Sequence, residues 1–259
     1  MKVTPKKHLG QHFLIDSGIS ERIASSITGH GGYSHLLEIG PGTGALTDFL
    51  LKGSNKITAI DIDTESIPFL YEKYKGVERL KIVHGDFLKT NLDEVESGLL
   101  GVTGNFPYNI SSQIFFHILD YRDKVPEVVC MLQKEVAERL VGEKDNGILT
   151  ILLHAWYNIE YLFTVPQYVF DPPPKVMSGV VRLTRNERQT LGCDEKLFKT
   201  VIKVTYHNRR KTLRNNLKSL NLSTEFLAGD FFNRRAEELS VDEFVKLVNE
   251  IAEAKTHHS

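Results

Sequence analysis

The sequence predicts an α/β fold in which a mostly parallel sheet is followed by a small domain of helices. Three observations lead to this prediction. A glycine-rich stretch, Glu38–Gly44, separates a short apolar run from a segment with helical spacing. Strand-like and helix-like segments then alternate, which is typical of parallel strands joined by right-handed crossovers. After about Arg188 only helical patterns follow, so we expect an α/β domain at residues 1–188 and a helical domain at residues 189–259.

The composition is that of a globular protein, with 41% hydrophobic and 25% charged residues. No apolar run is long enough to span a membrane, and the start of the chain lacks the apolar core of a signal peptide, so we expect a cytoplasmic protein. Cys130 and Cys193 are far apart and lack companions for a metal site, which predicts free thiols. The net charge of −1 gives no global sign of a nucleic-acid partner, so nucleic-acid binding has to be judged from local basic segments.

The first expected element is a helix at Ser17–Ser26, which Asp16 can cap. The segment before it, Lys6–Leu14, combines basic residues, a glycine and an aromatic residue. Their order matches neither the spacing of a helix nor the alternation of a strand. On composition alone, a solvated arm and a functional segment both stay open.

The glycine-rich stretch forms a turn between a strand at Leu36–Ile39 and a helix at Ala45–Leu51. Gly40 and Gly42 permit backbone angles that other residues avoid and let a ligand approach the main chain, while the start of the helix offers free N–H groups. We therefore expect a cofactor cradle. An ordinary glycine turn of an α/β domain is the alternative.

The spacing of the turn fits two cofactors. Gly40, Gly42 and Ala45 satisfy the loose dinucleotide pattern, so NAD stays open. Glu38 lies two residues before the first glycine, where its charge would crowd a pyrophosphate but would suit a sulfonium or an amino group. This favours S-adenosylmethionine.

Two further carboxylates follow predicted strands. The next elements are a strand at Lys56–Ile60 followed by Asp61, a helix at about Glu65–Tyr74, and a strand at Leu80–His84 followed by Asp86. Because ligands bind beyond the carboxyl ends of parallel strands, Glu38, Asp61 and Asp86 should share one pocket. Asp61 lies where a ribose-binding acid is expected. Asp86 suits either the amine of an adenine or the capping of the following turn.

The stretch after the fourth strand, Gly101–Thr103, indicates the reaction. The exocyclic nitrogen of adenine is a poor nucleophile because it shares its lone pair with the ring. The Asn105 side-chain oxygen and the Pro107 carbonyl can accept its two hydrogens and hold it in line with a methyl group. Tyr108 offers a flat face for the base, and no metal is needed because the charge of a sulfonium disperses during transfer. A rigid turn with a packed tyrosine is the alternative.

The remaining segments complete the α/β domain and supply a loop. We expect strands at Glu127–Leu132, Tyr161–Val165 and Val180–Leu183, and helices at Lys134–Val141 and Leu149–Trp156. Consecutive prolines make Val169–Val176 an extended, stiff loop that can wall a pocket, with Phe170 as a second stacking surface. A stiff connector is an equally sufficient explanation.

The helical domain carries a dense group of basic residues. Its helices are expected at Glu195–Tyr206, Arg209–Leu220, Thr224–Ala228 and Val241–Ala254. The basic residues on the second of these are Arg209, Arg210, Lys211, Arg214 and Lys218. A solvated face is one explanation, and beside an adenine-shaped site phosphate binding is the better one. Lys6 and Lys7 form a second basic group, at the N-terminus.

Several segments together resemble a known family. They are Gly10–Leu14 (GQHFL), Glu38–Gly44 (EIGPGTG), Gly85 with Asp86, Asn105–Ser111 (NFPYNIS), Met131–Val136 (MLQKEV), Phe170–Val176 (FDPPPKV) and Arg209–Asn215 (RRKTLRN). In this order, and over nearly the whole chain, they resemble the KsgA (RsmA) rRNA adenine dimethyltransferases. The combination is very specific, although the glycine motif alone is weak.

The resemblance implies a Rossmann-like class I methyltransferase with a small C-terminal α-helical domain that binds rRNA. It implies that S-adenosylmethionine is used to dimethylate N6 of two adjacent adenosines in the 3′-terminal hairpin of 16S rRNA, within the immature 30S subunit. The implied cofactor contacts are His12, Leu14, Gly40, Asp61, Asp86 and Asn105. Two positions depart from the family pattern, since the family commonly has Asn at the position of His12 and Glu at that of Asp61. A monomer is consistent with every motif.

Under this interpretation the target adenine leaves its stack and enters between Tyr108 and another apolar or aromatic wall. Three alternatives stay open. The related class that dimethylates 23S rRNA and confers macrolide resistance shares the chemistry, and a 30S assembly factor would share the basic helical domain. An NAD-dependent oxidoreductase would need a proton-transfer pair, which does not accompany the glycine turn.

Overall fold

The computed structural model describes residues 3–142 and 147–256. Within these ranges the chain forms two compact units. One contains the residues up to 138 together with 157–185, and the other contains 139–156 together with the residues from 186 onward. Residues 139–156 therefore group with the second unit, whereas the sequence assigned them to the first domain. The functional boundary after residue 188 stays a prediction.

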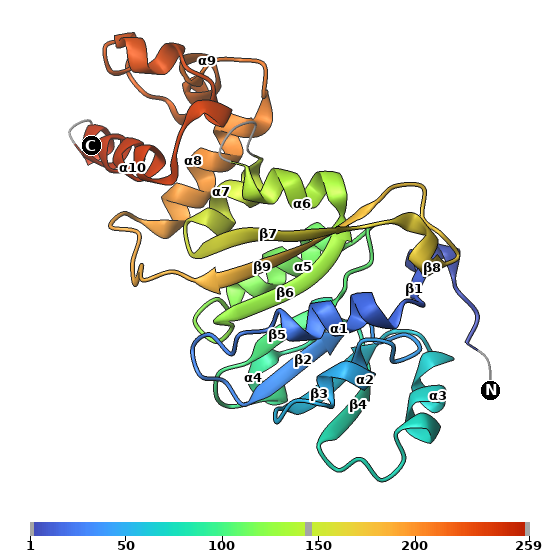
Figure 1. Cartoon of the computed structure of the whole chain (residues 1–259). Coiled ribbons are helices and arrows are strands. Elements are labelled where there is room, and N and C mark those ends of the chain that lie inside the picture. The colour runs from blue at the N-terminus through green and yellow to red at the C-terminus, as the bar shows by residue number, and fades with distance from the viewer. Residues whose placement is uncertain (1–2, 143–146, 257–259) are drawn as a thin grey trace. The chain divides into compact units, whose positions relative to one another are not determined.

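A seven-stranded sheet in the order β4-β3-β2-β5-β6-β9-β7 forms the centre of the first unit (Figure 1). Its parallel strands are β2 (His35–Ile39), β3 (Lys56–Asp61), β4 (Leu80–His84), β5 (Gly101–Asn105) and β6 (Glu127–Gln133). β9 (Ser178–Arg185) is antiparallel to β6, and β7 (Tyr157–Val165) is antiparallel to β9. The predicted α/β sheet is confirmed. The strand order reverses between β2 and β5, which is where open α/β sheets bind ligands.

Helices connect the strands, and two short segments form a separate ribbon. The helices of this unit are α1 (Ser17–Ser25), α2 (Thr47–Leu50), α3 (Ser66–Lys73), α4 (Leu92–Val95) and α5 (Ser111–Asp120), with the 3-10 turns η1 (Lys7–Leu9), η2 (Phe87–Lys89) and η3 (Gln167–Val169). Asp16 caps α1 as predicted, because its carboxylate accepts the Ile19 N–H at 3.0 Å. β1 (Phe13–Leu14) pairs with β8 (Phe170–Asp171), which ties the N-terminal arm to the proline-rich loop.

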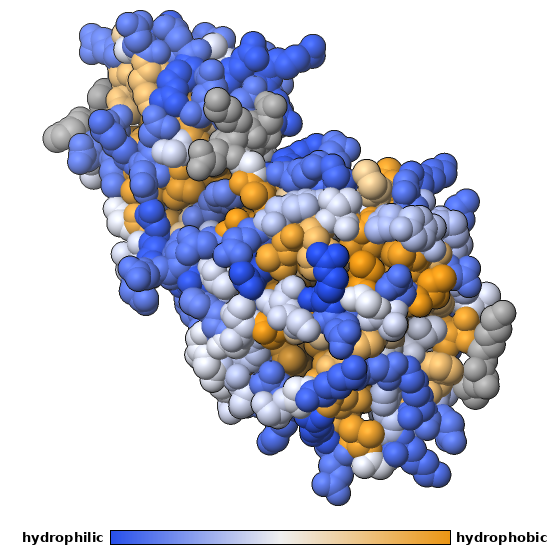
Figure 2. Space-filling model, in the orientation of Figure 1, coloured by the Kyte–Doolittle hydropathy of each residue, from blue (hydrophilic) through white to orange (hydrophobic). Residues whose placement is uncertain are grey.

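The strands carry apolar residues on both faces because helices cover both, with α1 in front of the sheet and α5 behind it in Figure 1. Ile23 of α1, Leu50 and Leu36 belong to one buried cluster. Phe106, which follows β5, meets Phe115 of α5 edge-on at 5.7 Å. On the face shown in Figure 2, apolar side chains also gather at the end of the sheet where β1 and β8 lie. This packed scaffold fixes the strand ends that build the site.

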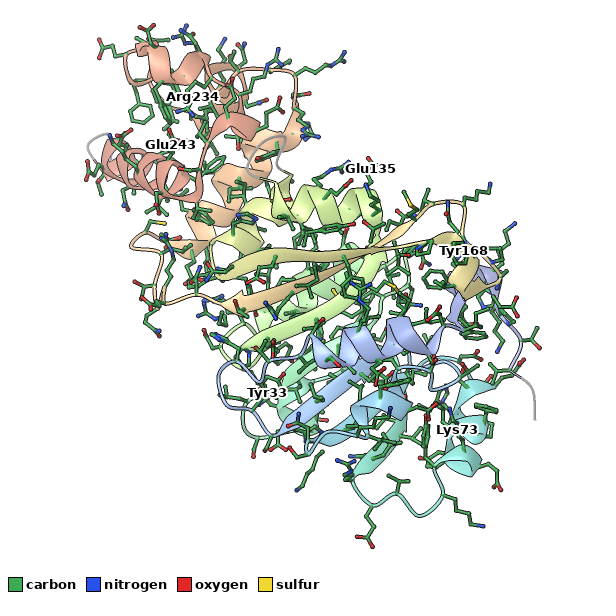
Figure 3. The ribbon with its side chains drawn as sticks, in the orientation of Figure 1. Tyr33, Lys73, Glu135, Tyr168, Arg234 and Glu243 are labelled. Atoms are coloured by element: carbon green, nitrogen blue, oxygen red, sulfur yellow. The ribbon has the colours of Figure 1, made fainter. Side chains whose placement is uncertain are left out.

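The second unit is helical. Its helices are α7 (Ile148–His154), α8 (Glu195–His207), α9 (Leu213–Leu217) and α10 (Val241–Thr256), with the 3-10 turns η4 (Lys218–Leu220), η5 (Phe226–Ala228), η6 (Asp230–Asn233) and η7 (Ala236–Glu238), and α6 (Lys134–Val141) begins in the first unit and ends in the second. Phe244 lies 6.5 Å from Phe198 and 6.4 Å from Tyr206, ring to ring. Arg234 forms an ion pair with Glu243 of α10 (Figure 3).

Over the described ranges, no helix has the length and apolarity needed to cross a membrane.

One predicted helix of this unit is wrong. The segment Arg209–Leu220 is not a single helix, because α8 ends at His207, the chain turns over residues 208–212, and only five residues form α9. The side chain of Asn216 stabilises the turn by donating its amide hydrogens to three backbone carbonyls. These are the carbonyls of Thr205 at 2.7 Å, Asn208 at 3.2 Å and Lys211 at 3.4 Å. The predicted helix at Thr224–Ala228 is reduced to η5.

Candidate active site

A cavity of about 230 Å³ lies beyond the carboxyl ends of the parallel strands, where the strand order reverses. The ends of β2, β3 and β5, the segment after β4 and the N-terminal arm form its walls. The predicted residues that line it are His12, Gly40, Gly42, Asp61, Asp86, Asn105, Pro107 and Tyr108. The structure therefore brings the residues predicted for cofactor and for base into one place.

Glu38 and Leu14 line a smaller cavity that shares Asn105 and the glycine turn with the main one. The Glu38 carboxylate is buried and accepts the Thr47 hydroxyl at 2.6 Å. Burial raises the pKa of Glu38 to about 7, although the hydrogen bond from Thr47 lowers it. A cation beside this carboxylate would favour its ionised form, as an ammonium or a sulfonium would.

Asp61 closes the glycine turn onto the next strand. Its carboxylate accepts the Gly42 N–H at 3.1 Å and the Asp63 N–H at 2.9 Å, and burial raises its pKa. Gly42 has a φ of +56°, and a Cβ atom there would lie 2.9 Å from the ring of Phe13. Glycine is required at this position for both reasons, so the turn presents its backbone to the cavity without a side chain.

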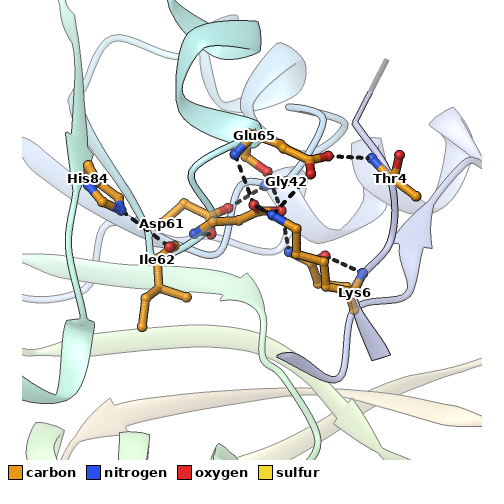
Figure 4. A network of polar contacts seen from close by, with 10 residues as sticks. Thr4, Lys6, Gly42, Asp61, Ile62, Glu65 and His84 are labelled. Atoms are coloured by element: carbon orange, nitrogen blue, oxygen red, sulfur yellow. Dashed lines mark hydrogen bonds and ion pairs between the residues drawn. The ribbon is translucent and has the colours of Figure 1, made fainter. Parts of the chain in front are cut away.

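A polar network holds the N-terminal arm against the loop after β3 (Figure 4). The Asp63 carboxylate accepts the Gln11 amide at 2.9 Å and pairs with the Lys6 ammonium. That ammonium also lies 3.4 Å from the Glu65 carboxylate. The segment is therefore not a solvated arm. Lys6 was predicted to contact RNA, and its pairing with two carboxylates disfavours that prediction. Lys7 is exposed.

Asn105 at the end of β5 is oriented by the arm. Its Nδ2 donates to the His12 carbonyl at 3.0 Å, and since a carbonyl can only accept, the amide orientation is set and Oδ1 is left as an acceptor. The His12 Nδ1 lies 2.7 Å from the Pro172 carbonyl and so carries a hydrogen. The His12 ring lies 5.6 Å from that of Tyr108. His12 thus joins the arm, the end of β5 and the proline-rich loop.

Tyr108 and Pro107 are held by contacts of their own. The Tyr108 hydroxyl is hydrogen-bonded to that of Ser178 at 2.6 Å, and burial raises its pKa. The Pro107 carbonyl accepts the Ile110 N–H at 3.1 Å. Because a carbonyl oxygen has two lone pairs, it can accept a second hydrogen. Both acceptors predicted for an amine are therefore present in the cavity wall.

Of two other predicted residues, Asp86 lies where it was expected and Phe170 does not. Asp86 lines the cavity, but it also accepts the Leu88 N–H at 3.0 Å and caps η2, which is the alternative role that the sequence left open. Phe170 is only 2% exposed and belongs to the buried cluster that contains Leu14 and Val169. The pairing of β8 with β1 turns its ring inward, so the prediction of a second stacking surface at Phe170 is corrected.

Comparison with known proteins identifies the family. The model of the family described as ribosomal RNA adenine dimethylase matches residues 3–253. The chain belongs to this family. The dimethylase is 52% identical over 252 residues to the ribosomal RNA small subunit methyltransferase A of Cytophaga hutchinsonii, and the match covers 96% of this chain and 97% of that protein.

Solved structures agree with this assignment. A dimethyladenosine transferase from Plasmodium falciparum has a TM-score of 0.78 at 28% identity, with 94% of this chain and 98% of that chain covered. The 23S rRNA methyltransferase ErmE has a TM-score of 0.72 at 22% identity, with 93% and 99% covered, which shows a common fold alone. The dimethylase has the predicted Rossmann-like class I methyltransferase fold. It is an rRNA adenine methyltransferase and not the oxidoreductase that the glycine turn left open.

Sequence reasoning missed some residues of the dimethylase cavity. Gln11, Ile62, Phe87 and Leu88 line it without a predicted role. Ile62 is half exposed directly after Asp61, so it offers an apolar surface beside the predicted ribose-binding acid. An apolar residue directly after a carboxylate at a strand end is the sequence signal that could have indicated Ile62. Among the described residues, no group of three or more His, Cys, Asp or Glu is placed to hold a metal ion.

The basic group in the second unit of the dimethylase is divided in two. Arg209, Arg210 and Lys211 are exposed on the turn over residues 208–212, and Arg209 lies 3.2 Å from Glu237. Arg214 instead donates to the carbonyls of Leu227 at 2.8 Å, Ala228 at 3.1 Å and Gly229 at 3.2 Å. Its guanidinium is used within the fold, which disfavours the predicted contact with RNA.

Proposed function

We propose that the dimethylase adds two methyl groups to N6 of each of two adjacent adenosines in the 3′-terminal hairpin of 16S rRNA, with S-adenosylmethionine as donor, during 30S maturation. The orientation of Asn105 carries the proposal. Its Nδ2 is committed to the His12 carbonyl, so Oδ1 is the atom left to accept a hydrogen at the cavity wall. An acceptor beside Pro107 and Tyr108 suits the amine of a flat base.

Residues at the ends of β2 and β3 suit the methyl donor. The backbone at Gly40 and Gly42 is open to the cavity. Asp61 can accept ribose hydroxyls with the lone pairs that its two backbone donors leave, and Glu38 can balance a positive charge. The bound donor supplies an electrophilic methyl group. Further contacts are proposed at His12, Leu14 and Asp86.

The turn from Asn105 to Tyr108 prepares the amine. Asn105 Oδ1 and the Pro107 carbonyl accept its two hydrogens, which directs the nitrogen lone pair out of the plane of the ring and toward the methyl group. Tyr108, anchored through Ser178, stacks on the base after it has left the RNA stack. The nitrogen gains a methyl group and loses a proton to solvent. One N–H then remains, and either acceptor can hold it for the second transfer.

Two observations favour the small ribosomal subunit. The relative from Cytophaga hutchinsonii is named for that subunit, and the exposed Arg210 and Lys211 suit contact with an RNA backbone. We infer a monomer that works in the cytoplasm, where its substrate would be assembled. A 23S rRNA substrate is the alternative, because ErmE shares the fold.

The test is methylation of 30S particles that lack adenine dimethylation, with labelled S-adenosylmethionine and with naked 23S rRNA as the second substrate. Digestion and mass spectrometry should find dimethyladenosine at two adjacent positions near the 3′ end. Transfer only to 23S rRNA, or to neither RNA while the cofactor binds, would overturn the assignment of substrate.

The role of Asn105 is tested in the same assay. Asn105→Ala should lose transfer by about 100-fold or more, because the amine loses an oriented acceptor. The control is Asn249→Ala, which removes an exposed asparagine whose amide donates to Gly192 in the second unit. Wild-type transfer by Asn105→Ala at saturating cofactor would contradict the mechanism.

A further inference from the structure

Exposed apolar and aromatic side chains gather next to the active-site cavity. Tyr168 of η3 is 79% exposed and Ile15 is 64% exposed, and Val176 and Met177 are exposed as well. We call these four residues the Tyr168 patch. Figure 3 places Tyr168 beside β8, at the end of the sheet where apolar side chains gather in Figure 2. An exposed aromatic ring in such a group marks a binding surface rather than packing.

The backbone that carries the patch is held in place. The Ile15 N–H donates to the Val169 carbonyl at 2.9 Å, and the next pair along the ribbon is Leu14 with Phe170. Val169 is buried on one side of Tyr168, while β7 ends at Val165, opposite Ser178. The Tyr168 ring is therefore exposed on a fixed turn and needs no rearrangement of the backbone to meet a ligand.

Two hydrogen bonds connect residues close to the patch in sequence to the active site. Tyr108, whose ring lines the cavity, is bonded to Ser178, and Ser178 directly follows Met177 of the patch. His12, also in the cavity wall, is bonded to the Pro172 carbonyl of the loop between Tyr168 and Met177. The segment that carries Tyr168, Val176 and Met177 is thus bonded at two points to the wall of the cavity that would receive the target adenine.

We propose that the Tyr168 patch binds a nucleotide of the rRNA strand next to the target adenosine, with its base stacked on the Tyr168 ring. This rests on the proposed function. Extrusion of the target breaks its stacking on neighbouring bases, and an exposed aromatic ring beside the pocket can replace part of what they lose. Lys175, exposed two residues before Met177, is placed to meet a phosphate of the same strand. Tyr168 takes the outer stacking role that the sequence assigned to the buried Phe170.

The first test replaces the ring while keeping the apolar character. Tyr168→Leu should weaken binding to undermethylated 30S particles roughly 5- to 100-fold and raise KM accordingly, whereas Tyr168→Phe should bind as the wild type does. The dissociation constant for S-adenosylmethionine should not change in either variant. Tyr71→Leu, which removes another exposed tyrosine from α3, is the control, with thermal unfolding measured for all variants.

The second test identifies the partner. Lys175→Gln should reduce the slope of log affinity against log salt by about 0.7–0.9, the value for one phosphate contact, while Tyr168→Leu should leave the slope unchanged. Ultraviolet crosslinking and mass spectrometry should join Tyr168 to a nucleotide close to the target.

Three results would overturn the proposal. They are equal binding by Tyr168→Leu and the wild type, a crosslink to a ribosomal protein, and equal losses in Tyr168→Leu and Tyr168→Phe. Failure of the proposed function is distinguishable, because it appears as loss of methyl transfer by the wild-type protein. Dependence of rRNA binding on Tyr168 can persist in that case.

Discussion

Burial of the Glu38 carboxylate makes the stability of the dimethylase depend on pH. Its pKa of about 7 in the folded protein lies above the ordinary value of 4.5. Between these values the folded state keeps a proton that the unfolded state has lost, so the free energy of unfolding should fall as the pH rises through this window. The loss should reach roughly 3 kcal/mol and then level off above the folded pKa. Urea unfolding at a series of pH values measures it.

Glu38→Gln separates this carboxylate from every other titrating group. The variant should lack the decline, so the difference between the two curves belongs to Glu38. Saturating S-adenosylmethionine should flatten the wild-type curve if a positive charge binds beside the carboxylate, because the charge favours its ionised form. Parallel curves for the two proteins would show that Glu38 is already ionised in the folded state.

The site residues that were predicted correctly can be recognised from the residues next to them in the sequence. Glu38 and Asn105 lie at strand ends whose apolar runs and glycine or proline turns are visible within a few residues. Phe170 is different, because an apolar residue in a proline-rich loop has the same signal whether exposed or buried, and the pairing of β8 with the distant β1 decides its burial. The environment of the Lys6 ammonium likewise depends on a residue far along the sequence, because Asp63 pairs with it.

The turn that presents Arg210 and Lys211 depends on Asn216 of α9. Asn216→Ala removes an amide that donates to three carbonyls around the turn, which should lower the free energy of unfolding by roughly 1–3 kcal/mol. Amide exchange over residues 208–212 should become faster, and affinity for 30S particles should fall. Asn215→Ala is the matched control, since the side-chain amide of this exposed neighbour donates to the Thr212 hydroxyl at 3.2 Å and to no carbonyl of the turn over residues 208–212. Equal effects of the two substitutions would contradict the assignment.

Glu127 at the start of β6 holds the connection from α1 to β2. The buried carboxylate accepts the N–H groups of Thr28, Gly29 and His30 and the hydroxyls of Thr28 and Tyr33, at 2.6–3.3 Å. Glu127→Ala leaves these donors unpaired and should lower the free energy of unfolding by roughly 3–5 kcal/mol in urea. Glu94→Ala, at an exposed carboxylate, should cost far less, and a similar cost would contradict this role for Glu127.

The elements themselves were predictable to different degrees. The strands β2, β3, β5 and β6 are mostly apolar and buried on both faces, so a short apolar run between turns is enough to predict them. The edge strand β4 has only Ile82 buried. The sequence predicted a break after Tyr206, but it placed the start of the next helix at Arg209 and not at Leu213. The turn over residues 208–212 was not predictable, because it is the Asn216 amide, bonded to backbone carbonyls around it, that stabilises this turn. The grouping of residues 139–156 with the second unit likewise depends on packing between distant segments.

At the scale of the whole molecule, the proposed function assigns methyl transfer to the cavity of the first unit and phosphate contacts to the exposed cations of the second. Since phosphate contacts are screened by salt and cofactor contacts are enclosed, the two contributions can be separated by ionic strength. Combining Arg210→Gln with Lys211→Gln should lower the slope of log affinity for 30S particles against log salt by about 1.4–1.8. The dissociation constant for S-adenosylmethionine should stay that of the wild type.

Arg214→Gln provides the contrast within the same basic segment. Its guanidinium donates to three backbone carbonyls, so its loss should lower the melting temperature and leave the salt slope unchanged. The double variant of Arg210 and Lys211 should keep the melting temperature and lower the salt slope, because neither side chain is buried. Equal slopes for Arg214→Gln and the double variant would show that charge alone, and not its position on the turn, governs binding. A changed slope only in the double variant would identify residues 208–212 as the surface through which the second unit binds rRNA.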